Sequence, residues 1–228
     1  MFEDFKVFET TLAGRPLVVE TGKVAQLANG SCLIRYGETA VLCAVTASEK
    51  PREGIDFFPL SVDYEEKLYA VGKIPGSFQR REGRPREKAI LTSRVIDRPV
   101  RPLFSKDMRN DVSIVCTVMS VDPDCPPDVI NPTAEQEAKS QMHVTVASTA
   151  DLVAMIEAGA NEIDNETMYG GIMAGHAANQ EIVRFINDIV SQIGKPKTAF
   201  ESNEPDAAMY EAIKENSLCT GYRRQADS

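Results

Sequence analysis

The run VSIVCTVMSV, residues 112–121, decides which fold the chain can adopt. It contains no Gly or Pro, and β-branched residues make up most of it. Such residues favour strands, and a strand this apolar fits between two neighbours rather than at the edge of a sheet. The sequence therefore predicts a sheet with residues 112–121 in its interior.

Shorter runs upstream predict further strands of that sheet. Residues 17–21, 31–35 and 39–46 are apolar or β-branched, and turn signals separate them at Asn29-Gly30 and Tyr36-Gly37. The Asn-Gly pair is the stronger hairpin signal of the two. We expect these runs to form a meander, with a further strand over residues 57–64.

Two longer segments have helical patterns. Residues 86–98 contain neither Gly nor Pro, and we expect that helix to end near Pro99 because the residue before a proline is pushed out of the helical region. Residues 166–193 carry an apolar stripe and stop at Gly194-Lys195-Pro196. Between these helices, residues 122–128 form a proline-rich connector, and residues 143–148 and 152–158 are predicted strands. We expect a short helix at 206–215 and poor order over 217–228.

The composition is that of a globular protein with a real core. Of its 228 residues 43% are hydrophobic, and its formal net charge is −9. The apolar run 40–45 is too short to cross a bilayer and the N-terminus lacks the basic start of a signal peptide, so we expect a cytoplasmic protein. The five cysteines have no C-x-x-C spacing, which favours reduced structural thiols over disulfides or zinc ligands.

The charge is unevenly distributed. Residues 80–109 contain ten basic and four acidic side chains, so this basic segment carries +6 and the rest of the chain −15. A charge run of this kind is usually a solvated helix face. Here most of its cations are arginines, whose planar forks suit phosphate, and it begins in a loop, residues 76–85, that carries an aromatic residue. Arginine beside an exposed aromatic side chain fits single-stranded nucleic acid.

No residue cluster meets a catalytic specification. His143 and His176 are far apart in sequence, and neither is paired with a nucleophile or an orienting carboxylate, so a structural or solvated role is favoured for both. Asp122 and Asp124 could hold a magnesium ion, but their proline-rich surroundings favour a turn. The glycines form neither a phosphate loop nor a dinucleotide fingerprint. We therefore predict no catalytic and no metal-binding residues.

Four stretches of the chain have a specific pattern in common with a known family. They read VETGKVA (19–25), DFFPLSVDYEE (56–66), GSFQRREGRP (76–85) and IDRPVRPLF (96–104), and NPT (131–133) and GIMAGH (171–176) fit the same pattern. Over about residues 1–195 the chain resembles the first ribonuclease PH-like domain of the bacterial polynucleotide phosphorylase family. The resemblance implies an α+β fold in which helices pack on a mixed β-sheet.

The resemblance also implies an activity. Members of the family are polyribonucleotide nucleotidyltransferases, phosphorolytic 3′-to-5′ exoribonucleases that act in RNA processing and mRNA degradation. Inorganic phosphate attacks the 3′-terminal phosphodiester and releases a nucleoside diphosphate, with magnesium as cofactor. The family forms ring-shaped homotrimers through which single-stranded RNA passes; neither DNA nor a membrane is an expected partner.

The resemblance assigns RNA contact to particular residues of this chain. The loop that grips RNA corresponds to Phe78, Gln79, Arg80 and Arg81, with Arg84 as a further candidate. Within the predicted helix, Glu87, Leu91, Arg94 and Arg98 fall near one face. The arginines at 94, 98 and 101 are candidate phosphate-binding residues; the alternative is a structural role, pairing with Asp97 and with carbonyls at the end of the helix.

Three departures from the family pattern shape the expected function. Gln79 stands where the family often has a second phenylalanine. The chain runs directly from Val129 to Ile130, where family members carry about one helix and two strands, and it ends after the first domain, with 196–228 as a partly disordered polar tail. We expect a truncated member that retains the RNA-gripping loop and lacks the catalytic second domain, where the family has its magnesium site. The alternatives are a non-catalytic RNA-binding or oligomerisation module and an unstable pseudogene product.

Overall fold

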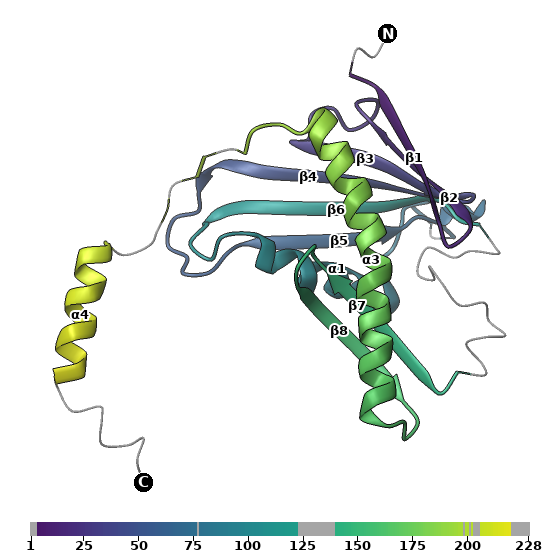
Figure 1. Ribbon diagram of the computed structural model, residues 1–228. Coiled ribbons are helices and arrows are strands. Elements are labelled where there is room, and N and C mark those ends of the chain that lie inside the picture. The colour runs from purple at the N-terminus through teal and green to yellow at the C-terminus, as the bar shows by residue number, and fades with distance from the viewer. Residues whose placement is uncertain are drawn as a thin grey trace.

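A six-stranded sheet forms the larger part of the computed structural model of the chain (Figure 1). The structure describes residues 4–76, 78–122, 140–197, 199–200, 202 and 206–219. The strands lie in the order β1-β2-β3-β4-β6-β5, antiparallel except for the parallel pair β5–β6, so the sheet is mixed as expected. Their bounds are Lys6–Leu12 (β1), Arg15–Thr21 (β2), Gly30–Tyr36 (β3), Thr39–Pro51 (β4), Leu60–Glu66 (β5) and Asn110–Ser120 (β6).

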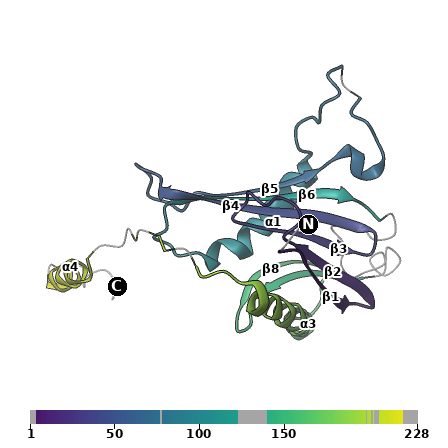
Figure 2. The same ribbon diagram turned by 90° about the horizontal axis from the view of Figure 1, so that it is seen from above.

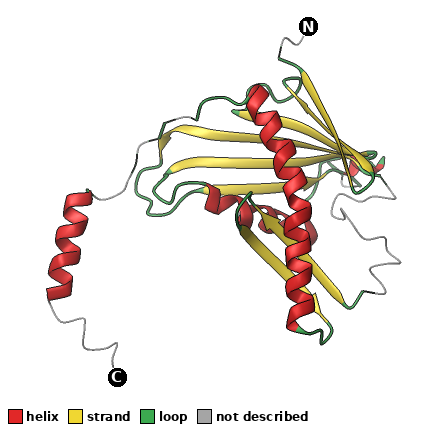
Figure 3. Cartoon of the chain, in the orientation of Figure 1, coloured by secondary structure: helices red, strands yellow, loops and turns green. Residues whose placement is uncertain are grey.

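A second, two-stranded sheet and the helices complete the fold. The antiparallel pair β7 (Met142–Ser148) and β8 (Val153–Ala160) contacts α3 (Asn165–Ile193), and α1 (Glu87–Val100) packs against β5. Two short 3₁₀ helices, η1 (Leu68–Val71) and η2 (Arg101–Leu103), flank the segment that contains α1, and α4 spans Ala207–Cys219. Figure 2 shows α3 and the β7–β8 pair on one side of the six-stranded sheet. Figure 3 colours the helices and strands separately. Their arrangement is of the expected α+β class.

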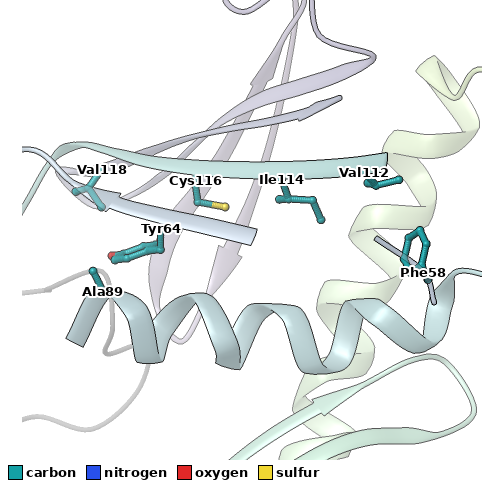
Figure 4. Packing of buried hydrophobic residues seen from close by; sticks show 7 residues of the cluster. All are labelled: Phe58, Tyr64, Ala89, Val112, Ile114, Cys116 and Val118. Atoms are coloured by element: carbon teal, nitrogen blue, oxygen red, sulfur yellow. The ribbon is translucent and has the colours of Figure 1, made fainter. Parts of the chain in front are cut away.

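One face of β6 holds most of the core. Val112, Ile114, Cys116 and Val118 alternate along β6, and all are buried. They point toward α1 and β5, where Ala89, Tyr64 and Phe58 complete the cluster (Figure 4). Burying a valine side chain stabilises a fold by about 1.5–3 kcal/mol, and Val118, at 1% exposed, has the most buried side chain of the cluster. The run 112–121 therefore lies inside the sheet, as its composition predicted.

Of the two turn signals, the second forms a tight turn and the first does not. β3 and β4 pair from Tyr36↔Thr39 onward, so Gly37 and Glu38 form a two-residue turn. Gly37 has a φ of +59°, a left-handed conformation that glycine adopts without strain, and a Cβ there would lie 2.9 Å from Asp122 Oδ2. β2 and β3 are instead joined by residues 22–29, and the Asn29 carboxamide oxygen accepts a hydrogen bond from the Ala47 N–H (2.9 Å).

Several element boundaries differ by a few residues from the sequence prediction, and β4 continues past residue 46 to Pro51. α1 continues through Pro99 to Val100, and Arg101 N–H closes its last turn by donating to the Asp97 carbonyl. A proline near the end of a helix removes one hydrogen bond without breaking the turns before it. β5 begins at Leu60 rather than at residue 57, and α4 extends beyond residue 215 to Cys219. The sequence analysis did not predict strand β1.

α3 lies close to β7 because two glycines face that strand. A Cβ at Gly171 would come within 2.7 Å of the Met142 side chain, and one at Gly175 within 2.9 Å of Val146. Asp164 caps the helix by accepting a hydrogen bond from Thr167 N–H (2.9 Å). α3 thus begins and ends close to where its sequence pattern predicted.

Some sequence predictions lie outside the described residues. They include most of the connector 122–128, the expected shortening between Val129 and Ile130, the NPT motif and residues 220–228. No helix within the described ranges is long and apolar enough to cross a membrane.

Candidate nucleic-acid interface

The segment between β5 and α1, residues 67–86, projects from the six-stranded sheet. Figure 2 shows it extending from the side opposite α3. At its base, Leu68 N–H donates a hydrogen bond to Glu82 Oε1 (2.9 Å), which ties the outgoing arm to the returning one. Lys67 Nζ lies 2.8 Å from Glu65 Oε2, and this ion pair raises the pKa of Lys67. These two contacts fix the base of the segment, and the tip beyond them is exposed to solvent.

The predicted RNA-binding residues lie at this tip. Phe78 is fully exposed (103%) and Gln79, Arg80, Arg81 and Arg84 are exposed as well. Arg80 has a φ of +53°, a left-handed conformation that is uncommon for residues other than glycine and asparagine. Within the described residues, the side chains of Arg80 and Arg84 make no hydrogen bond or ion pair. The tip therefore offers an aromatic face together with guanidinium groups that are open to solvent.

The arginines of α1 are differently placed. Glu87, Leu91, Arg94 and Arg98 are all exposed, so the face predicted for them points to solvent. Arg94 lines a hollow of about 400 Å³ between β5 and α1, but Asp63, Glu65 and Asp97 line it too. These carboxylates oppose the binding of an anion there. A phosphate role for Arg94 and Arg98 stays a prediction.

Arg101 is exposed on one side, but every donor group of its guanidinium binds a protein acceptor. Its Nε and Nη2 donate to the two oxygens of Asp97 (3.1 and 2.7 Å), its Nη1 to the Phe58 carbonyl (3.1 Å), and Nη2 also to the Leu60 carbonyl (3.2 Å). The guanidinium lies 6.0 Å from the centre of the Phe58 ring. These contacts join the end of α1 to the start of β5 and support the structural role that the sequence left open.

A larger hollow, of about 570 Å³, lies where β4, β5 and β6 meet. It is lined by polar side chains that sequence reasoning missed, among them Ser48, Ser61, Ser113, Arg52 and Asp111. Arg52 Nη1 lies 3.3 Å from Asp111 Oδ1, so its cation is already paired. No sequence signal could have found this hollow, because three strands from distant parts of the chain build it.

Asp107 lies at the far end of the basic segment. Hydrogen bonds from the hydroxyls of Ser105 and Ser202 hold the pKa of this buried carboxyl below its usual range, and the nearby Arg109 cation acts in the same direction. The contact with Ser202 ties the chain after α3 to the loop before β6.

The remaining candidates show no assembled catalytic centre. His143 is exposed on β7, and His176 lies on α3, 3.4 Å from the Gln180 side-chain amide. Asp122 Oδ2 accepts from Glu38 N–H and lies 4.0 Å from Arg15, which is a structural arrangement. Across the part of the chain that the structure describes, no three His, Cys, Asp or Glu side chains converge as metal ligands would.

Comparisons with known proteins place this geometry in context. The sequence pattern of the 3′ exoribonuclease family, domain 1, matches residues 13–161. The chain is 52% identical to a polyribonucleotide nucleotidyltransferase of Ruminiclostridium cellulolyticum and 51% identical to one of Lachnoclostridium phytofermentans. Each match runs over 245 residues, more than the 228 of this chain, and covers 92% of the chain but 35% of the relative. The chain thus spans about a third of the length of these relatives.

Solved structures share the fold at low identity. Rice Rrp46 superposes with a TM-score of 0.51 at 13% identity, covering 83% of this chain and 96% of that one. A chain of the Archaeoglobus fulgidus exosome, solved with RNA bound to the active site, gives 0.50 at 16% identity, covering 81% and 90%. At these identities the likeness concerns the fold alone.

Proposed function

The chain belongs to the 3′ exoribonuclease family, as domain 1 of that family, and from this membership we propose that it binds single-stranded RNA for phosphorolytic degradation from the 3′ end. The reaction transfers a terminal nucleotide of RNA to inorganic phosphate and releases a nucleoside diphosphate. Its relatives carry the name polyribonucleotide nucleotidyltransferase, which fits this chemistry. The observation that carries the proposal is the exposed tip with Phe78, Arg80 and Arg81.

Each tip residue has a defined task in the proposal. Phe78 presents both ring faces to solvent, so a base can stack on it, which is worth about 1–3 kcal/mol per base. Arg80 and Arg81 follow the backbone phosphates with their planar guanidinium groups. This grip reads no base edges and is therefore tolerant of sequence.

We place the bond-breaking step outside the residues that this chain shares with its relatives. The match covers 35% of the relative's length, and the described residues include no cluster suited to magnesium. No step of the proposed RNA contact passes through a metal ion. On this proposal the chain alone binds RNA and turns over little or none of it.

Two further features fit the family as proposed. The matched region is longer in the relatives than the whole of this chain, and we place the additional residues between Val129 and Ile130. In α3 the large apolar residues Tyr169, Met173, Ile186 and Val190 are exposed. Exposed apolar patches mark contact surfaces, which supports assembly into a ring-shaped homotrimer.

The experiment measures RNA binding and phosphorolysis separately. Purified chain that unfolds cooperatively in urea is titrated with a fluorescent poly(A) oligonucleotide over a range of salt concentrations. The double variant Arg80→Ala/Arg81→Ala should bind more weakly and flatten the slope of log K against log salt by about 0.7 for each lost phosphate contact. Release of nucleoside diphosphate in the presence of phosphate should stay at background.

A matched control separates the tip from general charge. The double variant Arg184→Ala/Lys195→Ala removes the same charge from α3 and the residues after it, and should leave the affinity near that of the parent chain. Equal weakening by both double variants, or unchanged binding in the tip variant, would contradict the proposed grip. Robust diphosphate release by the chain would contradict the placement of the chemistry elsewhere.

A further inference from the structure

Three cysteines lie side by side on three neighbouring strands. Cys32 on β3 pairs in register with Cys43 on β4, and Cys43 pairs with Cys116 on β6. Direct cross-strand partners point to the same face of a sheet, so the three side chains share the face that packs on α1. Cys116 is part of the core there (Figure 4), whereas Cys32 and Cys43 are half-buried.

The spacing of this thiol row matches that of a disulfide. Directly opposed residues of antiparallel strands have Cα atoms about 4.5–5.5 Å apart, inside the range of about 4.4–6.8 Å that a disulfide spans. The Sγ atoms of Cys43 and Cys116 are 3.5 Å apart, so rotation of the side chains is enough to bring them to bonding distance. Cys32 and Cys116 are two strands apart, about 9.5 Å, and cannot bond directly.

The hydrogen bonds within the row distinguish its members. The Cys43 thiol donates to Cys116 and interacts with Cys32, and these contacts raise the pKa of Cys43. The same contacts lower the pKa of Cys32 and of Cys116, although burial acts in the opposite direction on both. The thiolate is the reactive form of cysteine, so Cys32, half-buried at one end of the row, is the member best placed to react first.

We propose that the row formed by Cys32, Cys43 and Cys116 is a disulfide-forming site that reacts with a low-molecular-weight disulfide. In the first step the Cys32 thiolate attacks one sulfur of the oxidant, forms a mixed disulfide and expels one thiolate. The Cys43 thiol then loses its proton and attacks Cys32 Sγ, which expels the second thiolate. Two protein thiols are oxidised to one disulfide, and the small disulfide is reduced to two thiols.

The middle position of Cys43 allows the new bond to move. Cys116 can attack Cys43 Sγ, which forms the Cys43–Cys116 bond and releases Cys32 as a thiolate. This bond closes a loop that contains α1 and the whole RNA-binding tip. Cross-links that close long loops restrict the unfolded chain strongly, so the oxidised protein should melt about 5–15 °C above the reduced one.

The experiment maps the bond in the wild-type chain. The protein is incubated with oxidised glutathione, the remaining thiols are blocked with N-ethylmaleimide, and tryptic peptides are analysed by mass spectrometry without reduction. Cleavage after Arg35 separates Cys32 from Cys43. We expect the loss of two free thiols per chain, linked peptides that contain Cys43, and reversal by dithiothreitol. Cys125 shares a tryptic peptide with Cys116, so the mapping is repeated with Cys125→Ser.

The middle residue provides the decisive control. Cys43→Ala should lower the amount of disulfide-linked peptide that contains Cys32 or Cys116 at least tenfold. Cys32→Ala should retain the Cys43–Cys116 bond. Cys43→Val leaves no cavity in place of the thiol and should behave as Cys43→Ala does while melting cooperatively, which separates a lost thiol from a lost fold. Five free thiols in the treated wild-type chain, which means that no disulfide has formed, would overturn the proposal. So would linked peptides that contain Cys32 or Cys116 at the wild-type level in Cys43→Val.

Discussion

Arginine has different roles at the two ends of the basic segment 80–109. At its C-terminal end Arg101 donates to Asp97 and to two backbone carbonyls, and it joins α1 to β5. At its N-terminal end Arg80 and Arg84 point into solvent from a projecting loop. A charge count over the sequence cannot separate these uses, because the difference lies in whether carbonyls and carboxylates surround the guanidinium.

The comparison predicts that stability and RNA affinity respond to different arginines. Removing a donor from a satisfied network leaves its partners without hydrogen bonds, which costs stability. Removing an exposed guanidinium costs the fold little and costs the ligand a contact. The variants below test this separation, in order of decreasing expected effect.

Arg101→Ala should have the largest effect, on stability. The Leu60 carbonyl and the Asp97 carboxylate lose their Arg101 donor and the Phe58 carbonyl loses one of its two, so we expect the free energy of unfolding to fall by about 2–3 kcal/mol. Urea titration measures it. Arg98→Ala, an exposed neighbour on α1, is the control and should change stability by less than about 0.5 kcal/mol. Equal midpoints for the two variants would remove the distinction between the two ends of the segment.

Phe78→Ala should act on RNA and not on the fold. The ring is fully exposed, so its loss leaves the core intact but removes a stacking surface worth about 1–3 kcal/mol of binding. Fluorescence anisotropy with a poly(A) oligonucleotide measures the affinity. Phe57→Ala removes another exposed ring, 60% accessible and outside the loop, and should leave the affinity unchanged. Similar losses in both variants would indicate non-specific stacking.

On the proposed function, Gln79→Phe should raise the affinity of the tip for RNA. A second aromatic side chain beside Phe78 offers another stacking surface, and we expect a gain of about 1 kcal/mol, roughly fivefold in affinity. The same anisotropy titration measures it, with Gln79→Leu as a control for added apolar area. An affinity that is unchanged, or that rises equally with Leu, would show that stacking at position 79 does not contribute.

The smallest expected effect is on the stability of the fold at acidic pH. The pKa of Asp107 is lowered in the folded chain, so its contribution to stability is complete above the ordinary value of 3.8 and is lost as pH falls through the folded-state pKa. In Asp107→Asn that acid-dependent loss should be absent. Urea midpoints of both proteins between pH 7 and pH 2.5 measure it: the difference between them should shrink below pH 3.8. A constant difference would rule out this linkage.

The sequence predicted elements better than contacts. The apolar run around Val118 and the stripe that ends at Ile193 identified a strand and a helix correctly, because periodicity reports burial directly. α1 ends at Val100, near Pro99 as expected, although Pro99 itself lies inside the helix and the Arg101 N–H closes its last turn. The Asn29-Gly30 signal was outweighed by the second turn signal, where Gly37 fits beneath Asp122.

The site was predictable as a loop, and its surroundings were not. The exposed loop position of Phe78 and its neighbours could be predicted from local sequence, since a projecting loop needs no distant partner, while their contact with RNA stays a prediction. The structural use of Arg101 depends on the carbonyls of Phe58 and Leu60, about forty residues away. The thiol row depends on strand register across β3, β4 and β6, which no single stretch of sequence contains.

The packing of α1 also determines how the sheet can grow. β5 is an edge strand, yet its Tyr64 N–H donates to Ser93 Oγ (3.0 Å) and its Leu60 carbonyl accepts from Arg101, both from the α1 side. Backbone groups that are already bonded cannot template a strand from another molecule. These two contacts make the β5 edge a poorer template for another strand than the β1 edge at the opposite end of the six-stranded sheet.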